Sequence, residues 1–248
     1  MSAAGPRLSY VVPVHNNADG LSATVRHLME RLDSMQGCEV ILVENGSSDD
    51  SAAVCERLVM RHGEQPTALM ATSSQRGLGN AWRRGLELAS GDVVCLTASD
   101  LPFGFSDLDA VLTLQPRPEL CIGSKAHPDS DVSTSLLRRV MSAGFRQLRR
   151  MVLHLPTADP QGTIFMSTSL ARRVAPHLRC QGFLIGTEIV CWARRLGVTE
   201  HEVPVVYRAT GSSTVSPLRD SWRVLTGTFE LRRRLRTIDA TVPAPQTV

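Results

Sequence analysis

The sequence predicts an α/β fold: a single domain with a Rossmann-like, mostly parallel sheet flanked by helices. In the first half of the chain, short and almost wholly apolar segments alternate with longer segments whose apolar residues recur at helical spacing. Strands without polar alternation, separated by helices, are typical of a parallel sheet buried on both faces. The 248 residues are enough to bury a full core and fit one or two domains.

The expected elements follow one another in chain order. Apolar runs predict strands at 8–14, 38–46, 67–73 and 92–98. Between them, apolar residues at helical spacing predict amphipathic helices at 19–32, 49–62 and 79–89. A further strand with a polar end is expected at 121–127. Because helices separate the strands, the succession is βαβ and the strands are expected to run parallel.

Polar residues end three of these strands abruptly. His15–Asn17 follow the first strand, Glu44–Ser47 end the second, and Ser99 and Asp100 follow the fourth. Each one alone is more simply a turn, since turns favour Asn, Asp, Gly and Ser. The carboxyl ends of parallel strands, however, share one edge of the sheet, where ligands bind in α/β folds. Three polar ends at that edge favour a polar ligand.

Two later segments combine arginines with apolar residues. A helix is expected between Asp131 and Asp159, a stretch without acidic residues that contains Arg138, Arg139, Arg146, Arg149 and Arg150. A second basic amphipathic helix is expected at about 218–238. We expect the arginines to be solvated and the apolar stripes to pack on the core. A cationic amphipathic helix can also lie on an anionic membrane surface.

Composition argues against several classes of protein. No apolar run approaches the ~18 residues of a membrane span, and the amino-terminal segment lacks the apolar stretch of a signal peptide. The 6 cysteines form no Cys-x-x-Cys pair, which indicates core cysteines in a reducing compartment and no structural zinc. A net charge of +3 with 3 Trp, 2 Tyr and 6 Phe argues against nucleic acid as a partner. Of the 27 basic residues, all but Lys125 are arginine.

The order of motifs along the chain resembles one known family. The motifs are VVPVHNN at 11–17, VENGSSDDS at 43–51, QRGLGNA at 75–81 and LTASDL at 96–101, followed by GSK, DPQG, GTE, EVPVVYR and GSST between residues 123 and 214. In this order they are similar to family-2 glycosyltransferases of the GT-A fold, and most similar to the polyprenyl-phosphate mannose or glucose synthases. The resemblance covers about residues 8–225.

The resemblance implies how the chain is organised. It implies one glycosyltransferase domain over 1–238, with a nucleotide-sugar half at about 8–104, an acceptor half at about 118–225 and the basic helix at about 218–238. Residues 239–248 are expected to form a disordered tail. The protein is expected in the cytoplasm, with a peripheral position at the inner face of the plasma membrane as an open alternative.

The resemblance also implies residue roles. A donor site for a UDP- or GDP-sugar is implied for Pro13, His15, Asn17, Val43, Glu44, Asn45, Gly77, Gly79, Ala98, Ser99 and Asp100. The two glycines there would let the main chain pass close to the nucleotide. Catalytic roles are implied for Asp100, Lys125, Asp159, Gln161 and Arg208. Contacts to an acceptor phosphate are implied for Lys125, Arg138 and Ser213.

Asp100 stands at the second acidic position of the family's Asp-x-Asp motif, which holds Mg²⁺ or Mn²⁺ on the donor diphosphate. The first position of the motif is Ala98, and Pro102 stands two residues after Asp100. Neither side chain can bind a metal. Asp100 is therefore the one metal ligand expected, and a weak or dispensable metal requirement is implied.

Three functions remain open at this point. The first is inverting hexose transfer to a polyprenyl phosphate, which needs no general base because a phosphate monoester, with a second pKa of about 6, is already ionised. The second is a soluble glycosyltransferase acting on the hydroxyl of a small molecule or glycan, with Asp159, Glu188 or His127 as its base. The third is a nucleotide-sugar-binding protein without turnover, suggested by Ala98 and Thr214, where the family has Asp and Lys.

Overall fold

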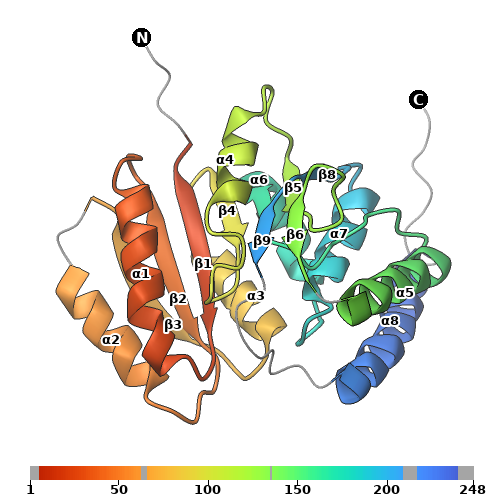
Figure 1. Cartoon of the computed structure of the whole chain (residues 1–248), viewed down its shortest axis with the longest axis horizontal. Coiled ribbons are helices and arrows are strands. Elements are labelled where there is room, and N and C mark those ends of the chain that lie inside the picture. The colour runs from red at the N-terminus through yellow and green to blue at the C-terminus, as the bar shows by residue number, and fades with distance from the viewer. Residues whose placement is uncertain (1–5, 63–65, 135, 209–216, 240–248) are drawn as a thin grey trace. The chain divides into compact units, whose positions relative to one another are not determined.

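Figure 1 shows the computed structural model, which describes residues 6–62, 66–134, 136–208 and 217–239. The chain divides into two compact units, residues 1–133 with 157–208 and residues 134–156 with 209–248. The first unit contains the sheets, and the second contains helices α5 (Leu136–Leu153) and α8 (Pro217–Asp239). This boundary does not coincide with the predicted donor and acceptor halves, so that division stays a prediction.

The first unit is built on a seven-stranded sheet in the order β3-β2-β1-β4-β7-β5-β8. The strands of this sheet are β1 (Leu8–Val14), β2 (Glu39–Glu44), β3 (Ala68–Ser73), β4 (Val93–Leu96), β5 (Leu120–Gly123), β7 (Ile164–Ser167) and β8 (His201–Val203). All neighbouring pairs are parallel except those of β7, which is antiparallel to β4 and β5. The mostly parallel sheet, flanked by helices, confirms the predicted fold class.

The helices of the first unit are α1 (Ala18–Leu32), α2 (Ser51–His62), α3 (Leu78–Leu88), α4 (Ser106–Thr113), α6 (Thr168–Val174), the 3-10 helix η1 (Ala175–His177) and α7 (Ile185–Arg195). The first three connect the first four strands, as predicted. A separate two-stranded sheet pairs β6 (Asp131–Ser133) with β9 (Val206–Arg208). β6, β8 and β9 were not predicted, because three residues are too few to show a period, and β7 was not predicted either.

The predicted strand at 121–127 is shorter in the structure. β5 ends at Gly123, and the N–H of His127 donates to the carbonyl of Ser124 at 3.2 Å. The polar residues of the GSK motif therefore lie in a turn after the strand. This places Lys125 at the carboxyl edge of the sheet.

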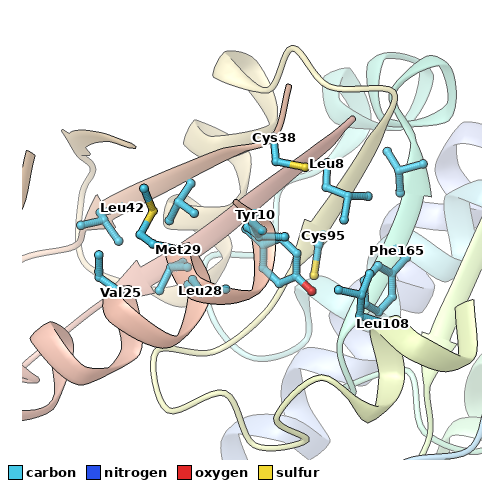
Figure 2. Packing of buried hydrophobic residues seen from close by; sticks show 14 of the residues in the cluster. Leu8, Tyr10, Val25, Leu28, Met29, Cys38, Leu42, Cys95, Leu108 and Phe165 are labelled. Carbon is cyan, nitrogen blue, oxygen red and sulfur yellow. The ribbon is translucent and has the colours of Figure 1, made fainter. Parts of the chain in front are cut away.

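The core of the first unit surrounds β1. All 7 residues of this strand are buried, which is why it reads as an apolar run. Figure 2 shows the Tyr10 hydroxyl beside the Cys95 sulfur, next to Leu108 and Phe165. The six cysteines are unpaired, and only Cys180 is not fully buried, as expected of core cysteines. Among the described helices, none combines the length and the hydropathy that a membrane crossing requires.

One of the buried carboxyl groups of the first unit lies at the start of α4. Asp107, in the first turn of α4, is 4% exposed, and its Oδ1 accepts from the N–H of Leu108 at 2.8 Å. Burial raises the pKa of Asp107 to about 6, although hydrogen bonds from Thr163 and Leu108 act in the opposite direction. Thr163 directly precedes β7, so the carboxyl group joins α4 to the segment that enters this strand.

We expect Asp107→Asn to change the pH dependence of stability. The folded protein holds the Asp107 proton more tightly than the unfolded chain, so the contribution of this group is full below pH 3.8 and is lost as pH rises through about 6. The loss corresponds to about 3 kcal/mol. In urea unfolding between pH 4 and 7.5, the free energy of unfolding of the variant should therefore increase relative to that of the wild type as pH rises. Asp109→Asn, on the exposed side of the same helix, is the control, and an equal gain there would contradict the assignment.

Candidate active site

The polar ends of β1 and β2 interlock at the carboxyl edge of the sheet. The two strands are parallel, so the residues that follow them leave the sheet side by side. The N–H of Asn16 donates to Ser47 Oγ at 3.1 Å, and the N–H of Ser48 donates to Asn16 Oδ1 at 2.8 Å. Asn17 adds a bond from its N–H to Ser51 Oγ at 2.9 Å. The two strand ends therefore meet, as predicted from their polar residues.

The loop after β4 joins the same edge. The carbonyl of Ser99 accepts from Thr24 Oγ1 at 2.6 Å and from Asn17 Nδ2 at 3.5 Å. The amide of Asn17, a predicted donor contact, thus ties α1 to the β4 loop. This bond holds the residue before Asp100 in place.

Three of the predicted donor residues lie beneath this edge. Pro13 and Val43 are paired in the β1–β2 register, and both are buried. Asn45 is 4% exposed, and its N–H donates to the carbonyl of Val14 at 3.0 Å. These three residues are buried below the surface of this edge, whereas His15 and Glu44 are partly exposed there.

His15 and Glu44 supply polar atoms at the surface of this edge. The carboxylate of Glu44 accepts from the N–H of Ser47 at 2.5 Å. Partial burial acts to raise the pKa of Glu44, but hydrogen bonds from Ser47 and Gly46 and the charge of His15 hold it below its ordinary value. His15 Nδ1 is buried and has no hydrogen-bond partner among the described residues. A buried ring nitrogen without a partner is available to a bound ligand.

Asp100 stands in a turn directly after β4. The N–H of Leu101 donates to the carbonyl of Ala98 at 3.2 Å, and the Asp100 side chain is exposed, with no hydrogen bond or ion pair to any described residue. The described residues also contain no group of three His, Cys, Asp or Glu side chains that could hold a metal. A single free carboxylate fits Mg²⁺ or Mn²⁺ only where substrate phosphates and water complete the coordination.

The amino end of α3 packs against the loop at 179–181. The N–H of Gly79 donates to the carbonyl of Gln181 at 2.8 Å. A Cβ on Gly79 would lie 2.0 Å from the carbonyl oxygen of Cys180, and a Cβ on Gly77, where φ is +127°, would lie 2.4 Å from that of Gln181. The protein's own loop therefore already requires glycine at these two positions, and the predicted approach of the main chain to a nucleotide stays a prediction.

Glu188 in α7 fixes that loop. Its side chain is 1% exposed, and Oε2 accepts from the N–H groups of Arg179 at 2.9 Å and Cys180 at 2.7 Å. A general base must reach the proton that it removes from the substrate. The buried carboxylate of Glu188 instead holds the main chain that packs on α3.

Asp159 lies on the segment that leads into β7. Glu202 of β8 accepts from the N–H groups of Ala158 and Asp159, both at 3.1 Å. A Cβ on Gly162 would lie 1.8 Å from the carbonyl oxygen of Gly123, so the segment packs directly on β5. Gln161 between them is exposed. Because β7 is antiparallel, the residues before it lie at the same edge as those that follow β4 and β5.

Lys125 follows β5 and faces Asp159. Its Nζ lies 3.5 Å from Asp159 Oδ2, and its main-chain N–H donates to the same oxygen at 3.2 Å. The two side chains are 37% and 15% exposed. The structure therefore brings together two of the predicted catalytic residues, which are 34 positions apart in the sequence.

Arg208 at the end of β9 is paired with Asp131 of β6. Their side chains form an ion pair, and Arg208 Nη1 also donates to the carbonyl of Asp131 at 3.1 Å. The hydrogen bond and the opposite charge raise the pKa of Arg208 and lower that of Asp131. A phosphate at Arg208 would have to compete with this carboxylate.

Two predicted acceptor contacts have no described geometry. Arg138 belongs to α5 of the second unit, and its side chain lies outside the described residues, as does Ser213. Both stay predictions.

Three residues near Lys125 and Asp159 were missed by sequence reasoning: Phe103, Glu202 and Tyr207. Glu202 and Tyr207 lie within the EVPVVYR motif, which was quoted only for the resemblance. Phe103 carries no sequence signal, because only the fold brings its ring within 5.6 Å of the Lys125 ammonium.

The sequence is similar to those of known glycosyltransferases. The family model of glycosyl transferase family 2 matches residues 9–173. A dolichyl-phosphate beta-glucosyltransferase of Dictyostelium discoideum is 24% identical over 242 residues, which cover 92% of this chain and 74% of that relative.

Solved structures of two sugar-transferring enzymes share the fold. Mannosyl-3-phosphoglycerate synthase from Rubrobacter xylanophilus matches with a TM-score of 0.69 and 17% identity, covering 98% of this chain and 79% of that one. Glucosyl-3-phosphoglycerate synthase from Mycobacterium tuberculosis, in complex with Mn²⁺, uridine diphosphate and phosphoglyceric acid, matches with a TM-score of 0.66 and 20% identity, covering 92% and 79%.

We expect Gly79→Ala to destabilise the protein in the absence of any ligand. The new Cβ would meet the carbonyl oxygen of Cys180 at 2.0 Å, an overpacking that costs about 1–3 kcal/mol. The control is Gly182→Ala, because no atom lies within 4 Å of a Cβ built there. Urea unfolding of both variants measures the difference. A Gly79→Ala protein as stable as the wild type would contradict the packing of α3 on this loop.

Proposed function

Because the chain belongs to glycosyl transferase family 2, we propose that it moves a hexose, with inversion, from a UDP- or GDP-sugar to a polyprenyl phosphate. The similarity to a dolichyl-phosphate beta-glucosyltransferase extends over 92% of this chain and supports a lipid phosphate as the acceptor. The polar side chains at the carboxyl edge of the sheet support binding of both donor and acceptor there.

The donor is proposed to bind over the ends of β1, β2 and β4. His15 offers a ring nitrogen without a partner among the described residues, and Glu44 offers a carboxylate that is held ionised. Both groups suit the polar edges of a base and a ribose. Asp100 projects from the next strand of the same sheet, where the diphosphate would lie.

The observation that carries the acceptor proposal is the state of the candidate bases. Asp159 accepts from the N–H of Lys125 and lies 3.5 Å from its ammonium, and Glu188 is buried under two loop N–H groups. His127 Nδ1 accepts from the N–H of Asp129 at 3.2 Å. A hydroxyl acceptor needs a base to take its proton, whereas a phosphate monoester already carries its nucleophilic oxygen ionised. The arrangement therefore favours the phosphate.

Inverting transfer then depends on charge and orientation. An oxygen of the acceptor phosphate attacks the anomeric carbon, and the bond to the nucleoside diphosphate breaks on the opposite face. Lys125 is proposed to orient the acceptor phosphate, with Arg138 and Ser213 as further contacts. Asp159 and Gln161 are proposed to face the sugar, and Arg208 to bind phosphate once Asp131 releases it. Positive groups directed at the acceptor phosphate and at the leaving nucleoside diphosphate stabilise the transition state.

A divalent ion is proposed to bind at Asp100 together with the donor. The M. tuberculosis neighbour was crystallised with Mn²⁺ and uridine diphosphate, which supports a metal of this kind, Mg²⁺ or Mn²⁺. When bound, the ion would neutralise charge on the leaving diphosphate. Asp100 would supply one oxygen, and no other carboxylate is expected beside it, since Ala98 and Pro102 flank the turn.

The helices of the second unit are proposed to contact an anionic membrane surface. On α5, Arg139, Arg150, Val140 and Met151 are exposed, and both the arginine pair and the apolar pair recur at 11 residues, three turns apart on one face. On α8, Phe229 is 51% exposed and lies beside Arg233 and Arg236. Interleaved cationic and apolar side chains suit a bilayer interface.

Arg149 departs from the expected solvated face of α5. Its side chain is 3% exposed, and its guanidinium lies 4.6 Å from the centroid of the Phe145 ring. The reason is that α5 packs against α8 within the second unit, which buries one side of the helix. Arg149 is therefore excluded from the proposed membrane contact.

We expect turnover with farnesyl phosphate as a short acceptor and one of UDP-glucose, GDP-mannose or their close analogues as donor, giving a glycosyl phosphate. Mn²⁺ alone should leave the unfolding midpoint unchanged, while Mn²⁺ with the matching nucleoside diphosphate should raise it, because the ion needs phosphate ligands. Asp100→Asn should abolish this metal-dependent rise and slow turnover about 100-fold or more, with Asp109→Asn as the control.

Other outcomes of this assay would assign a different function. Transfer to a hydroxyl with no reaction on any lipid phosphate would identify the soluble class of glycosyltransferase. Nucleotide-sugar binding without turnover on either kind of acceptor would identify the binding protein. A midpoint raised by Mn²⁺ alone would contradict the single-carboxylate site.

We expect the Arg139→Gln, Arg150→Gln double variant to bind anionic liposomes about 30-fold more weakly, because each of the two basic residues at such a surface contributes about 1 kcal/mol. The matched control is Arg57→Gln with Arg61→Gln, two exposed arginines on α2. Co-sedimentation with vesicles containing phosphatidylserine measures both. An equal loss in the two double variants would contradict a specific surface on α5.

A further inference from the structure

The one lysine of the chain lies against two aromatic rings, although its side chain is 37% exposed. Its ammonium is bounded by the carboxylate of Asp159 and by the rings of Phe103 and Tyr207. The Nζ atom lies 5.6 Å from the centroid of Phe103 and 5.5 Å from that of Tyr207. A cation within about 6 Å of an aromatic face is attracted by the ring quadrupole. Two rings and a carboxylate therefore act on one charge.

The two rings are themselves held relative to each other. Their centroids are 6.1 Å apart with an interplanar angle of 74°, an edge-to-face arrangement. The Ser106 hydroxyl donates to the carbonyl of Phe103 at 2.9 Å and accepts from the N–H of Val206 at 2.9 Å. One hydroxyl thus joins the backbones on which the rings stand. Phe103 is also 4% exposed, which leaves its ring little freedom.

We propose that Phe103 and Tyr207 are positioning residues that hold the Lys125 ammonium beside Asp159, in an arrangement that accepts lysine and not arginine. This inference rests on the proposed function in one respect, that the ammonium orients the acceptor phosphate. The ring faces are not conventional hydrogen-bond acceptors, and within the described part of the chain Lys125 Nζ makes no hydrogen bond to the Tyr207 hydroxyl, so N–H groups not directed at Asp159 remain for phosphate oxygens.

The geometry explains why lysine stands here. An ammonium is a compact point charge that two perpendicular rings can approach together, whereas a planar guanidinium stacks on one ring face and directs a rigid fork of donors. Stacking on either ring would carry that fork away from Asp159. The chain uses arginine at every other basic position, so the exception coincides with the position that a guanidinium fits poorly.

A test independent of turnover uses the uniqueness of Lys125. Growth on ¹³C,¹⁵N-lysine labels this residue alone, and its ¹³Cε–¹Hε signal reports ring currents. We expect the signal upfield of free lysine in the wild type and in Tyr207→Phe, and displaced toward free lysine in Tyr207→Leu. Phe183→Leu, which removes an exposed ring elsewhere in the first unit, should leave it unchanged. A wild-type signal at the free-lysine position, or one that Tyr207→Leu does not move, would overturn the proposal.

A kinetic test then determines whether the placement of the Lys125 ammonium serves binding of the acceptor. Tyr207→Leu is expected to raise the KM for farnesyl phosphate about three- to tenfold and leave the KM for the sugar donor unchanged, while Tyr207→Phe restores the wild-type value. Lys125→Arg should not restore activity lost in Lys125→Ala. Equal KM changes for donor and acceptor, or full activity of Lys125→Arg, would contradict the proposed role. If no lipid phosphate reacts at all, the proposed function fails, and the labelled-lysine signal still decides whether the rings hold Lys125.

Discussion

The contact between Lys125 and Asp159 is the interaction on which the acceptor side of this site depends. Glu202 places Asp159 by accepting two consecutive N–H groups at 3.1 Å, and Asp159 in turn accepts from the N–H of Lys125 and lies 3.5 Å from its ammonium. One carboxylate is thereby fixed and neutralised at once. The Asp159 carboxylate is therefore not available as a general base. Its contact with Lys125 also places a positive charge where an anion can bind. The nature of the acceptor follows from this pairing.

The donor side is organised differently. There the polar ends of β1, β2 and β4 are joined by hydrogen bonds among their own loops, while the charged group nearest the expected diphosphate, Asp100, is left free of described partners. The loops are joined to one another and the Asp100 carboxylate is exposed, which suits a ligand that arrives with its own metal. On the acceptor side the charged side chains are already paired. A bound phosphate would replace Asp131 as the partner of Arg208, whereas Lys125 would keep Asp159 and gain the phosphate as a second partner.

Much of the fold could be predicted, because fully buried strands appear as apolar runs long enough to recognise, as with β1 and β2. The antiparallel direction of β7 could not be predicted, because it depends on pairing with β4 and β5, which lie far away in the sequence. Resemblance brought Lys125 and Asp159 into the candidate site, but it did not reveal that Gly79 packs against a loop about a hundred positions away. The partner of Arg208 was equally invisible, since Asp131 lies 77 residues earlier. Contacts of this kind exist only in the folded chain.

In the proposed reaction the acceptor phosphate binds already ionised, and no protein group takes a proton from it. The most direct measurement is the pH dependence of kcat/KM on the acid side, recorded with farnesyl phosphate and with a difluoromethylene phosphonate analogue of lower pKa. If the acceptor arrives ionised, the inflection lies at about pH 6 for the phosphate and moves down with the analogue by the difference between the pKa values of the two acceptors. An inflection at the same pH for both acceptors would instead reveal a base on the enzyme.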